Sequence, residues 1–222
     1  MKKLTKLFIL VITLVLTSQS FAQKVGIKAG LNLSTIDLKS TYITKAENYK
    51  IIPGFHLGPT FEIPFSNVFS LETSLLASTK GFRYTLYGSN STSNYGGKMV
   101  VNILYVDLPI TPKVTIDLGK LNFYGIAGPY IGIGLIGNAR KTYTENGETK
   151  TENDKINWGN KSDSQGLRRL DYGLVLGIGV ELKSFQFGLN YNHGIASLTG
   201  SIHDKFALTN RVLAISFGYT GL

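Results

Sequence analysis

Beyond residue 22, apolar side chains recur at every second position, and this two-residue period constrains the fold more than any other feature of the chain. In residues 24–33, every odd position from Val25 to Leu33 is apolar, and every even position is polar or glycine. Successive side chains of a β-strand point to opposite faces, so the pattern predicts a strand with one apolar face. No convincing helical periodicity follows residue 22, and we predict an all-β protein.

The same alternation returns along the chain and predicts eight strands, because seven further segments repeat it. The predicted strands are residues 24–33, 54–63, 69–80, 99–115, 121–136, 169–182, 185–196 and 211–220.

Two irregularities interrupt this pattern. The apolar positions change parity between Leu75 and Phe82, and a β-bulge near Gly81 would explain the change. Proline has no backbone N–H to donate, so we expect bulges or pairing gaps at the prolines that fall within the predicted strands. These are Pro59, Pro109 and Pro129.

The connections between the predicted strands alternate in length. Short turns are expected at residues 64–68, 117–120 and 183–184, and long polar segments at residues 34–50, 86–98, 137–167 and 197–210. Outer-membrane barrels have short turns at one end and long loops at the other. A β protein can span hydrocarbon only as a closed barrel, since every backbone N–H and C=O must find a partner. We therefore predict an eight-stranded antiparallel up-and-down transmembrane β-barrel.

The polar face of the predicted strands carries charges of both signs among many glycines. In a narrow barrel these side chains face the interior, where opposite charges satisfy one another as an ion network and leave no wide pore. An acid/base pair of Glu62 and Glu72 is the alternative that we considered. The predicted interior network contains Lys28, Glu62, Glu72, Asp107, Asp171 and Glu181, and Lys80 lies on the same face.

The N-terminal residues predict that the chain is exported. Lys2, Lys3 and Lys6 precede an apolar run at residues 7–16, and small residues follow up to Ala22. The run is too short to span a bilayer as a helix, and this order is typical of a secretory signal peptide. We predict a cleavable signal peptide at residues 1–22 and a barrel domain at residues 23–222.

Composition and charge exclude several classes of function. The chain has no cysteine, which excludes disulfides, Cys-ligated metal sites and thiol catalysis. The formal net charge is +9, but the basic residues are scattered and the chain is predicted to be exported. We therefore expect no nucleic-acid partner.

No motif predicts catalysis or a cofactor. Residues 132–137 match the glycine spacing of dinucleotide-binding sites, but a polar segment follows where that site needs a helix. We expect Gly128, Gly132 and Gly134 to face the barrel interior and make room for bulky neighbours. His56, His193 and His203 have no local catalytic signature, so we predict no catalytic residues, no metal and no cofactor.

The long segment at residues 137–167 is the main candidate for a contact outside the membrane. It mixes both charge signs and contains Trp158, the only tryptophan, as a candidate contact residue for a protein or glycan partner.

Five short motifs follow one another along the chain: Val25–Asn32, Tyr105–Ile110, Gly125–Tyr130, Leu170–Gly177 and Tyr191–Ile195. In this order they resemble the outer-membrane β-barrel domain family of Bacteroidetes, which includes PorT-like and porin-like proteins. The resemblance implies an eight-stranded barrel in the outer membrane, with membrane lipid and the barrel-assembly machinery as partners. It implies no activity, and the secretion-associated role of PorT belongs to one branch of the family. The chain departs from the usual assembly signal by ending in Leu222 rather than Phe.

The sequence thus predicts a non-enzymatic outer-membrane barrel with a structural, envelope or partner-binding role. A second interpretation is a soluble exported barrel that binds an apolar ligand, as lipocalins do. Its cavity would be lined by Leu71, Leu75, Ile131 and Ile133. A third is an outer-membrane enzyme using His56 and His193.

Overall fold

A computed structural model describes residues 23–40, 49–90, 93–145, 148–159, 166–199 and 206–221. The predicted signal peptide lies outside these residues, as does His203. Within the described ranges, no helix has the length and apolar character needed to cross a membrane. The strands are β1 (Lys24–Ser40), β2 (Tyr49–Lys50), β3 (Ile52–Pro64), β4 (Phe69–Ser74), β5 (Leu76–Asn90), β6 (Ser93–Asp117), β7 (Asn122–Glu145), β8 (Glu148–Lys155), β9 (Leu170–Leu182), β10 (Phe185–Gly194) and β11 (Phe206–Thr220).

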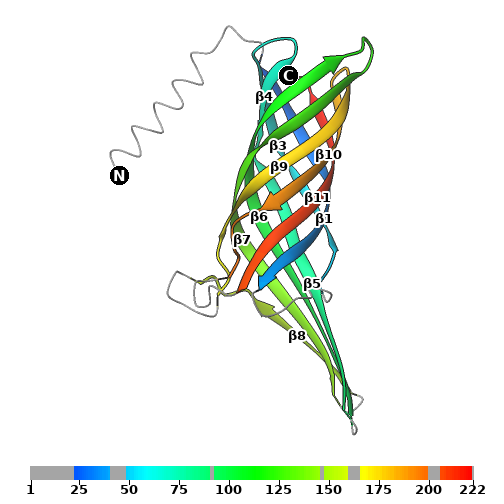
Figure 1. Cartoon of the computed structure of the whole chain (residues 1–222), viewed down its shortest axis with the longest axis vertical. Coiled ribbons are helices and arrows are strands. Elements are labelled where there is room, and N and C mark those ends of the chain that lie inside the picture. The colour runs from blue at the N-terminus through cyan, green and yellow to red at the C-terminus, as the bar shows by residue number, and fades with distance from the viewer. Residues whose placement is uncertain are drawn as a thin grey trace, which may run out of the picture.

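The strands form one antiparallel sheet that closes on itself (Figure 1). β1 pairs with β3 on one side and with β11 on the other, so the first and last strands seal the ring. β4 and β5 are separated only by Leu75 and occupy one place in the ring, between β3 and β6. β2 and β8 extend the sheet beyond β5 and β7. The ring therefore has eight strands, which confirms the predicted eight-stranded antiparallel barrel.

Both described ends of the chain and the short turns lie at one end of the barrel (Figure 1). These turns join β3 to β4, β6 to β7 and β9 to β10. Short turns mark the periplasmic end of outer-membrane barrels, so the opposite end faces the outside of the cell.

Two of the segments expected to be long loops at the outer end are largely strand. β5 and β6 stay paired out to Asn90 and Ser93, and β7 pairs with β8 over residues 138–145 and 148–155. Figure 1 shows these strands projecting beyond the ring. Threonine hydroxyls meet across the β7–β8 hairpin, Thr142 with Thr151 at 3.3 Å and Thr144 with Thr149 at 3.2 Å. Such polar cross-strand pairs stabilise a hairpin that has no continuous apolar face, which is why alternation did not reveal it.

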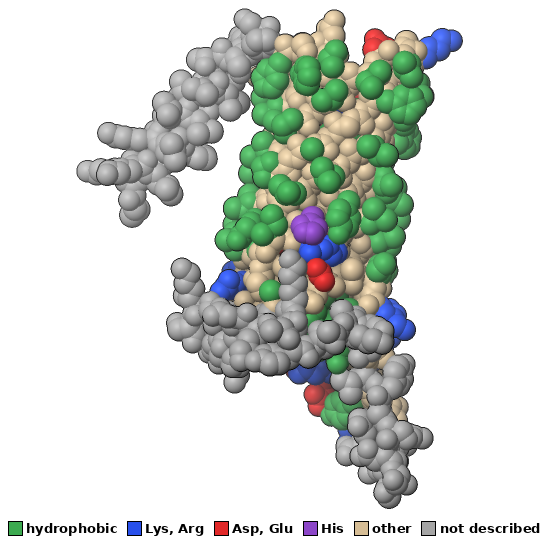
Figure 2. Space-filling model, in the orientation of Figure 1, with side chains coloured by type: hydrophobic (Ala, Val, Ile, Leu, Met, Phe, Trp, Pro, Cys, Tyr) green, Lys and Arg blue, Asp and Glu red, His purple; other side chains and the backbone are tan. Residues whose placement is uncertain are grey.

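The apolar face of the ring points outward, into the space that lipid fills (Figure 2). Leu75, Ile131 and Ile133 are 50%, 45% and 51% exposed, although the lipocalin-like interpretation placed them inside. The inward positions are instead polar, charged or glycine over most of the barrel. The soluble ligand-binding barrel is therefore wrong, because its apolar cavity wall is the outer surface of this one.

The prolines coincide with interruptions in pairing, as predicted. Pro59 lies opposite the break between β4 and β5, where its carbonyl accepts a hydrogen bond from the Leu75 amide at 3.0 Å. Direct pairing of β6 with β7 stops at Pro109 and Tyr130 and resumes at Lys113 and Ile126. Pro129 falls within this gap.

The predicted bulge near Gly81 is wrong. β5 and β6 keep one register from Leu76 to Asn90, and Phe82 stays on the inward face that Lys80 occupies. The apolar parity changes because the interior itself becomes apolar at this height. The register shift lies instead on β7, where the consecutive residues Leu135 and Ile136 both face outward.

Candidate functional site

A cluster of buried charges fills the periplasmic half of the barrel. Lys113 of β6 is fully buried, and its Nζ lies 2.9 Å from Glu62 Oε2 and 3.7 Å from Glu72 Oε2. It also bonds Glu181, and Lys28 pairs with the other oxygen of Glu72. Because strands on opposite sides of the ring supply these groups, the ion pairs tie the walls together across the interior.

A second charge cluster lies nearer the outer end. The Lys80 ammonium donates to Asp107 Oδ1 and Asp171 Oδ2, each at 2.9 Å. Its Nζ also lies 4.8 Å from the ring centroid of Tyr105 and 4.6 Å from that of Tyr130. All of these residues are buried, so Lys80 is held by two carboxylates and two aromatic rings with little access to water.

All six residues proposed for the interior network lie in these two clusters. Lys28, Glu62, Glu72 and Glu181 join the first, and Asp107 and Asp171 join the second.

Lys113, the centre of the first cluster, is absent from the predicted interior network. It lies six residues after Asp107 on the same strand, and this even spacing places both on one face. The parity of β6 was therefore a sufficient signal.

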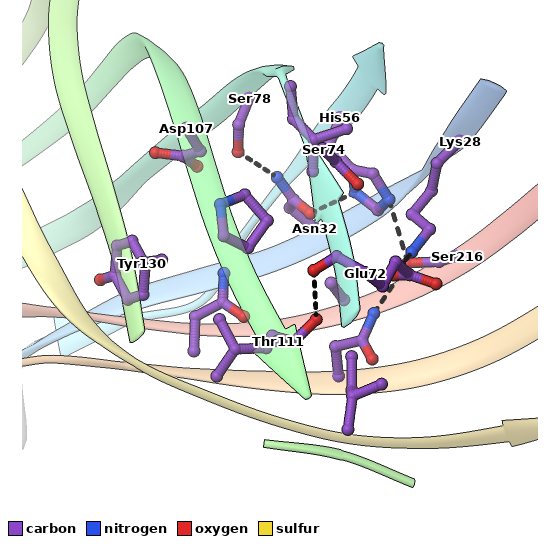
Figure 3. Close-up of a pocket in the computed structure, with 17 residues that line it drawn as sticks. Lys28, Asn32, His56, Glu72, Ser74, Ser78, Asp107, Thr111, Tyr130 and Ser216 are labelled. Atoms are coloured by element: carbon purple, nitrogen blue, oxygen red, sulfur yellow. Dashed lines mark hydrogen bonds and ion pairs between the residues drawn. The ribbon is translucent and has the colours of Figure 1, made fainter. Parts of the chain in front are cut away.

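A small polar cavity of about 50 Å³ separates the two clusters (Figure 3). At its wall, His56 Nδ1 lies 2.8 Å from Asn32 Oδ1 and His56 Nε2 lies 3.0 Å from Ser216 Oγ. The Asn32 amide also donates to Ser78 Oγ at 3.1 Å. The volume suits a few water molecules, since about 10–15 Å³ holds one.

The two described histidines, His56 and His193, show no catalytic arrangement. His56 bonds an amide and a hydroxyl, and no carboxylate hydrogen bond to it is present among the described side chains. His193 is exposed on the outward face of β10, where its ring contacts Tyr191. In the described part of the chain, no group of three or more histidine or acidic side chains is arranged to hold a metal ion.

An apolar plug closes the outer end of the interior. It comprises the buried residues Ile36, Phe82, Val101, Ile103, Tyr105 and Leu198. Trp158 packs against this plug, with Arg169 4.8 Å from the indole ring centroid. The indole is thus engaged within the barrel mouth rather than presented at the tip of a loop.

The glycines of the dinucleotide-like pattern make room for these interior groups. They lie on β7, which continues as a strand where a phosphate site would need a helix. A Cβ on Gly134 would lie 2.5 Å from Trp158 Cη2, and one on Gly132 would collide with the Asp107 carboxylate. Glycine therefore permits the close approach of a bulky side chain at both positions.

Two solved structures to which this chain is similar are Ail and the Neisserial surface protein A. Ail, the attachment invasion locus protein of Yersinia pestis, solved with the heparin analogue sucrose octasulfate, is 13% identical, with a TM-score of 0.33. The match covers 89% of this chain and 99% of that one. The Neisserial surface protein A is 10% identical over 88% of this chain and 96% of its own, with a TM-score of 0.35.

The comparison with curated proteins finds no match. Residues 18–200, most of the chain, match the family described as "outer membrane protein beta-barrel domain". Together with the closed ring and its outward apolar face, this match shows that the chain is an outer-membrane protein of the outer membrane protein beta-barrel domain family.

Proposed function

We propose that this protein is a non-enzymatic, non-conducting anchor that presents a rigid β-sheet to a partner outside the cell. The observation that carries the proposal is the continuation of β5, β6, β7 and β8 beyond a ring whose interior is filled. We call this projecting part, residues 82–90, 93–102, 137–145 and 148–155, the outer sheet.

The filled interior supports the absence of conduction. A solute would have to pass two sets of buried ion pairs and then the apolar plug. The cavity between the clusters holds only about 50 Å³, and eight strands enclose little more than their own side chains. The partners of His56 likewise support a structural role for this histidine rather than catalysis.

The outer sheet is structurally ordered, as a recognition surface must be. The eight residue pairs of the β7–β8 hairpin extend about 25 Å at roughly 3.4 Å per residue. Cross-strand contacts fix its polar side chains, including Lys141 Nζ with Asp154 Oδ2 at 2.8 Å and Tyr143 Oη with Glu152 Oε1 at 2.8 Å. A pre-ordered polar surface binds a protein or glycan without the entropy cost of ordering a loop.

The resemblance to PorT-like proteins supports a narrower candidate, a role associated with secretion. It rests on the ordered motifs, among them Tyr105–Ile110 and Gly125–Tyr130. Loss of protein secretion in a strain lacking this chain, restored by the intact gene, would support this role. Unchanged secretion would refute it. Export through a signal peptide at residues 1–22 and insertion by the barrel-assembly machinery complete the proposal.

The proposal is tested with a variant that lacks the far part of the outer sheet. Residues 87–96 and 142–151 are each replaced by an Asn-Gly turn, which joins positions already paired across the strands, 86 with 97 and 141 with 152. The ring should still fold, seen as a gel band that shifts on boiling. Neither the intact nor the shortened chain should conduct in planar bilayers, and discrete conductance steps from the intact chain would refute the closed interior.

Partner presentation is tested in intact cells with a photo-crosslinking residue at Thr144, near the far end of the hairpin. The matched control is Leu174, which is exposed on the membrane face of β9. A discrete protein or glycan adduct at Thr144, absent at Leu174, is the expected result. No adduct at Thr144, in cells where the barrel is folded, would refute partner presentation.

A further inference from the structure

We infer that one face of the outer sheet binds the phosphate groups of outer-leaflet lipid headgroups. The inference rests on the proposed placement of this sheet outside the cell and names a ligand for its membrane-facing side. Its evidence is the sorting of charge between the two faces of the sheet, and the position of the basic side relative to lipid.

Strand register defines this basic face. Arg83, Val100, Arg140 and Asn153 lie opposite one another across β5, β6, β7 and β8. Lys98 and Lys155 have the same parity as Val100 and Asn153, so they lie on the same side. Wherever side chains are described on this face, every charged residue is basic.

The acidic residues of the hairpin lie on the opposite face. Glu148, Glu152 and Asp154 alternate with the basic-face positions of β8, and Lys141 opposes Glu152 on β7. The opposite face thus mixes both signs, since Lys141 and Lys150 lie there with the acidic residues, whereas the described side chains of the basic face include no acidic one. The separation leaves the basic face suited to an anion.

The basic face is hollowed and rich in hydrogen-bond donors. A hollow of about 610 Å³ is lined by Arg83, Lys98 and Arg140 together with Asn102 and Asn138. Among the described residues, the buried Nε of Arg83 has no hydrogen-bond partner, and the Nε of Arg140 donates to Asn153 Oδ1 at 3.1 Å. Guanidinium groups with free N–H donors match the oxygens of a phosphate.

The position of the face points to lipid rather than a soluble anion. The same side of β6 and β7 carries the lipid-facing residues Leu104 and Ile136 just below Asn102 and Asn138. Arg140 lies four residues beyond Ile136, about 13 Å along a strand that tilts by roughly 40°. This places the Cα of Arg140 about 10 Å above that of Ile136, from where the long side chain reaches back toward the headgroup layer.

The test uses the full chain in detergent and native mass spectrometry with equal amounts of phosphatidic acid and phosphatidylcholine. The variant carries Arg83→Gln, Lys98→Gln and Arg140→Gln. The control carries Lys120→Gln, Lys141→Gln and Lys150→Gln, which remove equal charge from the periplasmic turn and the opposite face. Each basic residue near anionic lipid contributes roughly fivefold, so the variant should lose at least about tenfold in preference for phosphatidic acid, and the control should keep it.

Three outcomes would overturn the inference. They are equal retention of the two lipids by the intact chain, preference that survives in the variant, and displacement of phosphatidic acid by millimolar inorganic phosphate or sucrose octasulfate. The last would show that the face takes a soluble anion. The crosslink at Thr144 is measured on the same variant, so a lost lipid preference with an intact adduct separates this inference from the proposed function.

Discussion

Replacing Lys113 with methionine tests whether the periplasmic charge cluster holds the barrel together. Lys113 is fully buried, and its ammonium is the shared partner of Glu62 and Glu181. Methionine keeps most of the side-chain volume but removes the buried cation that these carboxylates share. Removing one member of a buried ion pair costs about 3–5 kcal/mol, so we expect the free energy of unfolding to fall by that amount.

The matched control is Lys24→Met, which removes a cation from the same carboxylate at the barrel rim. Lys24 Nζ lies 3.8 Å from Glu62 Oε1, but its side chain is 48% exposed, so the expected loss is only about 0–1 kcal/mol. Both are measured by urea unfolding in phosphatidylcholine vesicles, followed by Trp158 fluorescence and by the gel shift on boiling. Equal losses for the two variants would refute the reasoning.

A compensated variant separates charge from packing. Combining Lys113→Met with Glu62→Gln and Glu181→Gln removes the uncompensated charges and should recover most of the lost stability. Failure to recover would mean that the lysine acts through packing, for example against the Tyr124 ring 4.7 Å from its Nζ.

Two further substitutions probe the plug. Gly134→Ala should displace Trp158, shift its emission to the red and cost about 1–3 kcal/mol, whereas Gly125→Ala, whose Cβ would have no atom closer than 3.9 Å, should leave emission unchanged. Equal spectra would contradict the packing described. Leu198→Ala in the plug should cost about 2–5 kcal/mol by urea unfolding, and Leu174→Ala on the lipid face should cost less, since no sealed cavity forms there.

The barrel was predictable because one face of each strand contacts lipid and must be apolar. Apolar residues therefore recur at every second position within the membrane, as from Val25 to Leu33. Outside the membrane this alternation stops. The outer sheet was not predicted because it lies outside the membrane, where this requirement does not apply. Water accepts polar side chains on either face, so nothing obliges residues 138–155 to alternate in hydropathy. Their threonine pairs stabilise a strand that composition alone describes as a loop.

The interior charges were predictable as a set but not as pairs. Parity places Asp107 and Asp171 inside, but the ring's geometry brings both to Lys80. The plug was harder to predict, because Phe82 is apolar on the face that carries Lys80 two positions earlier. In the sequence, a change from a polar to an apolar interior gives the same shift of apolar positions as a β-bulge. The continuous pairing of β5 with β6 shows that no bulge is present there.

The seal between β1 and β11 also sets the order of folding. Gly26 and Thr220 are paired, so the ring cannot close until nearly the whole chain has reached the membrane. Contacts this distant in sequence make folding slow, and the waiting chain exposes apolar strands to water. A chain that lacked β11 would leave β1 and β10 with unpaired backbone groups in hydrocarbon. Closure of the ring by β11 is thus the last step that pairs every backbone group of β1 and β10.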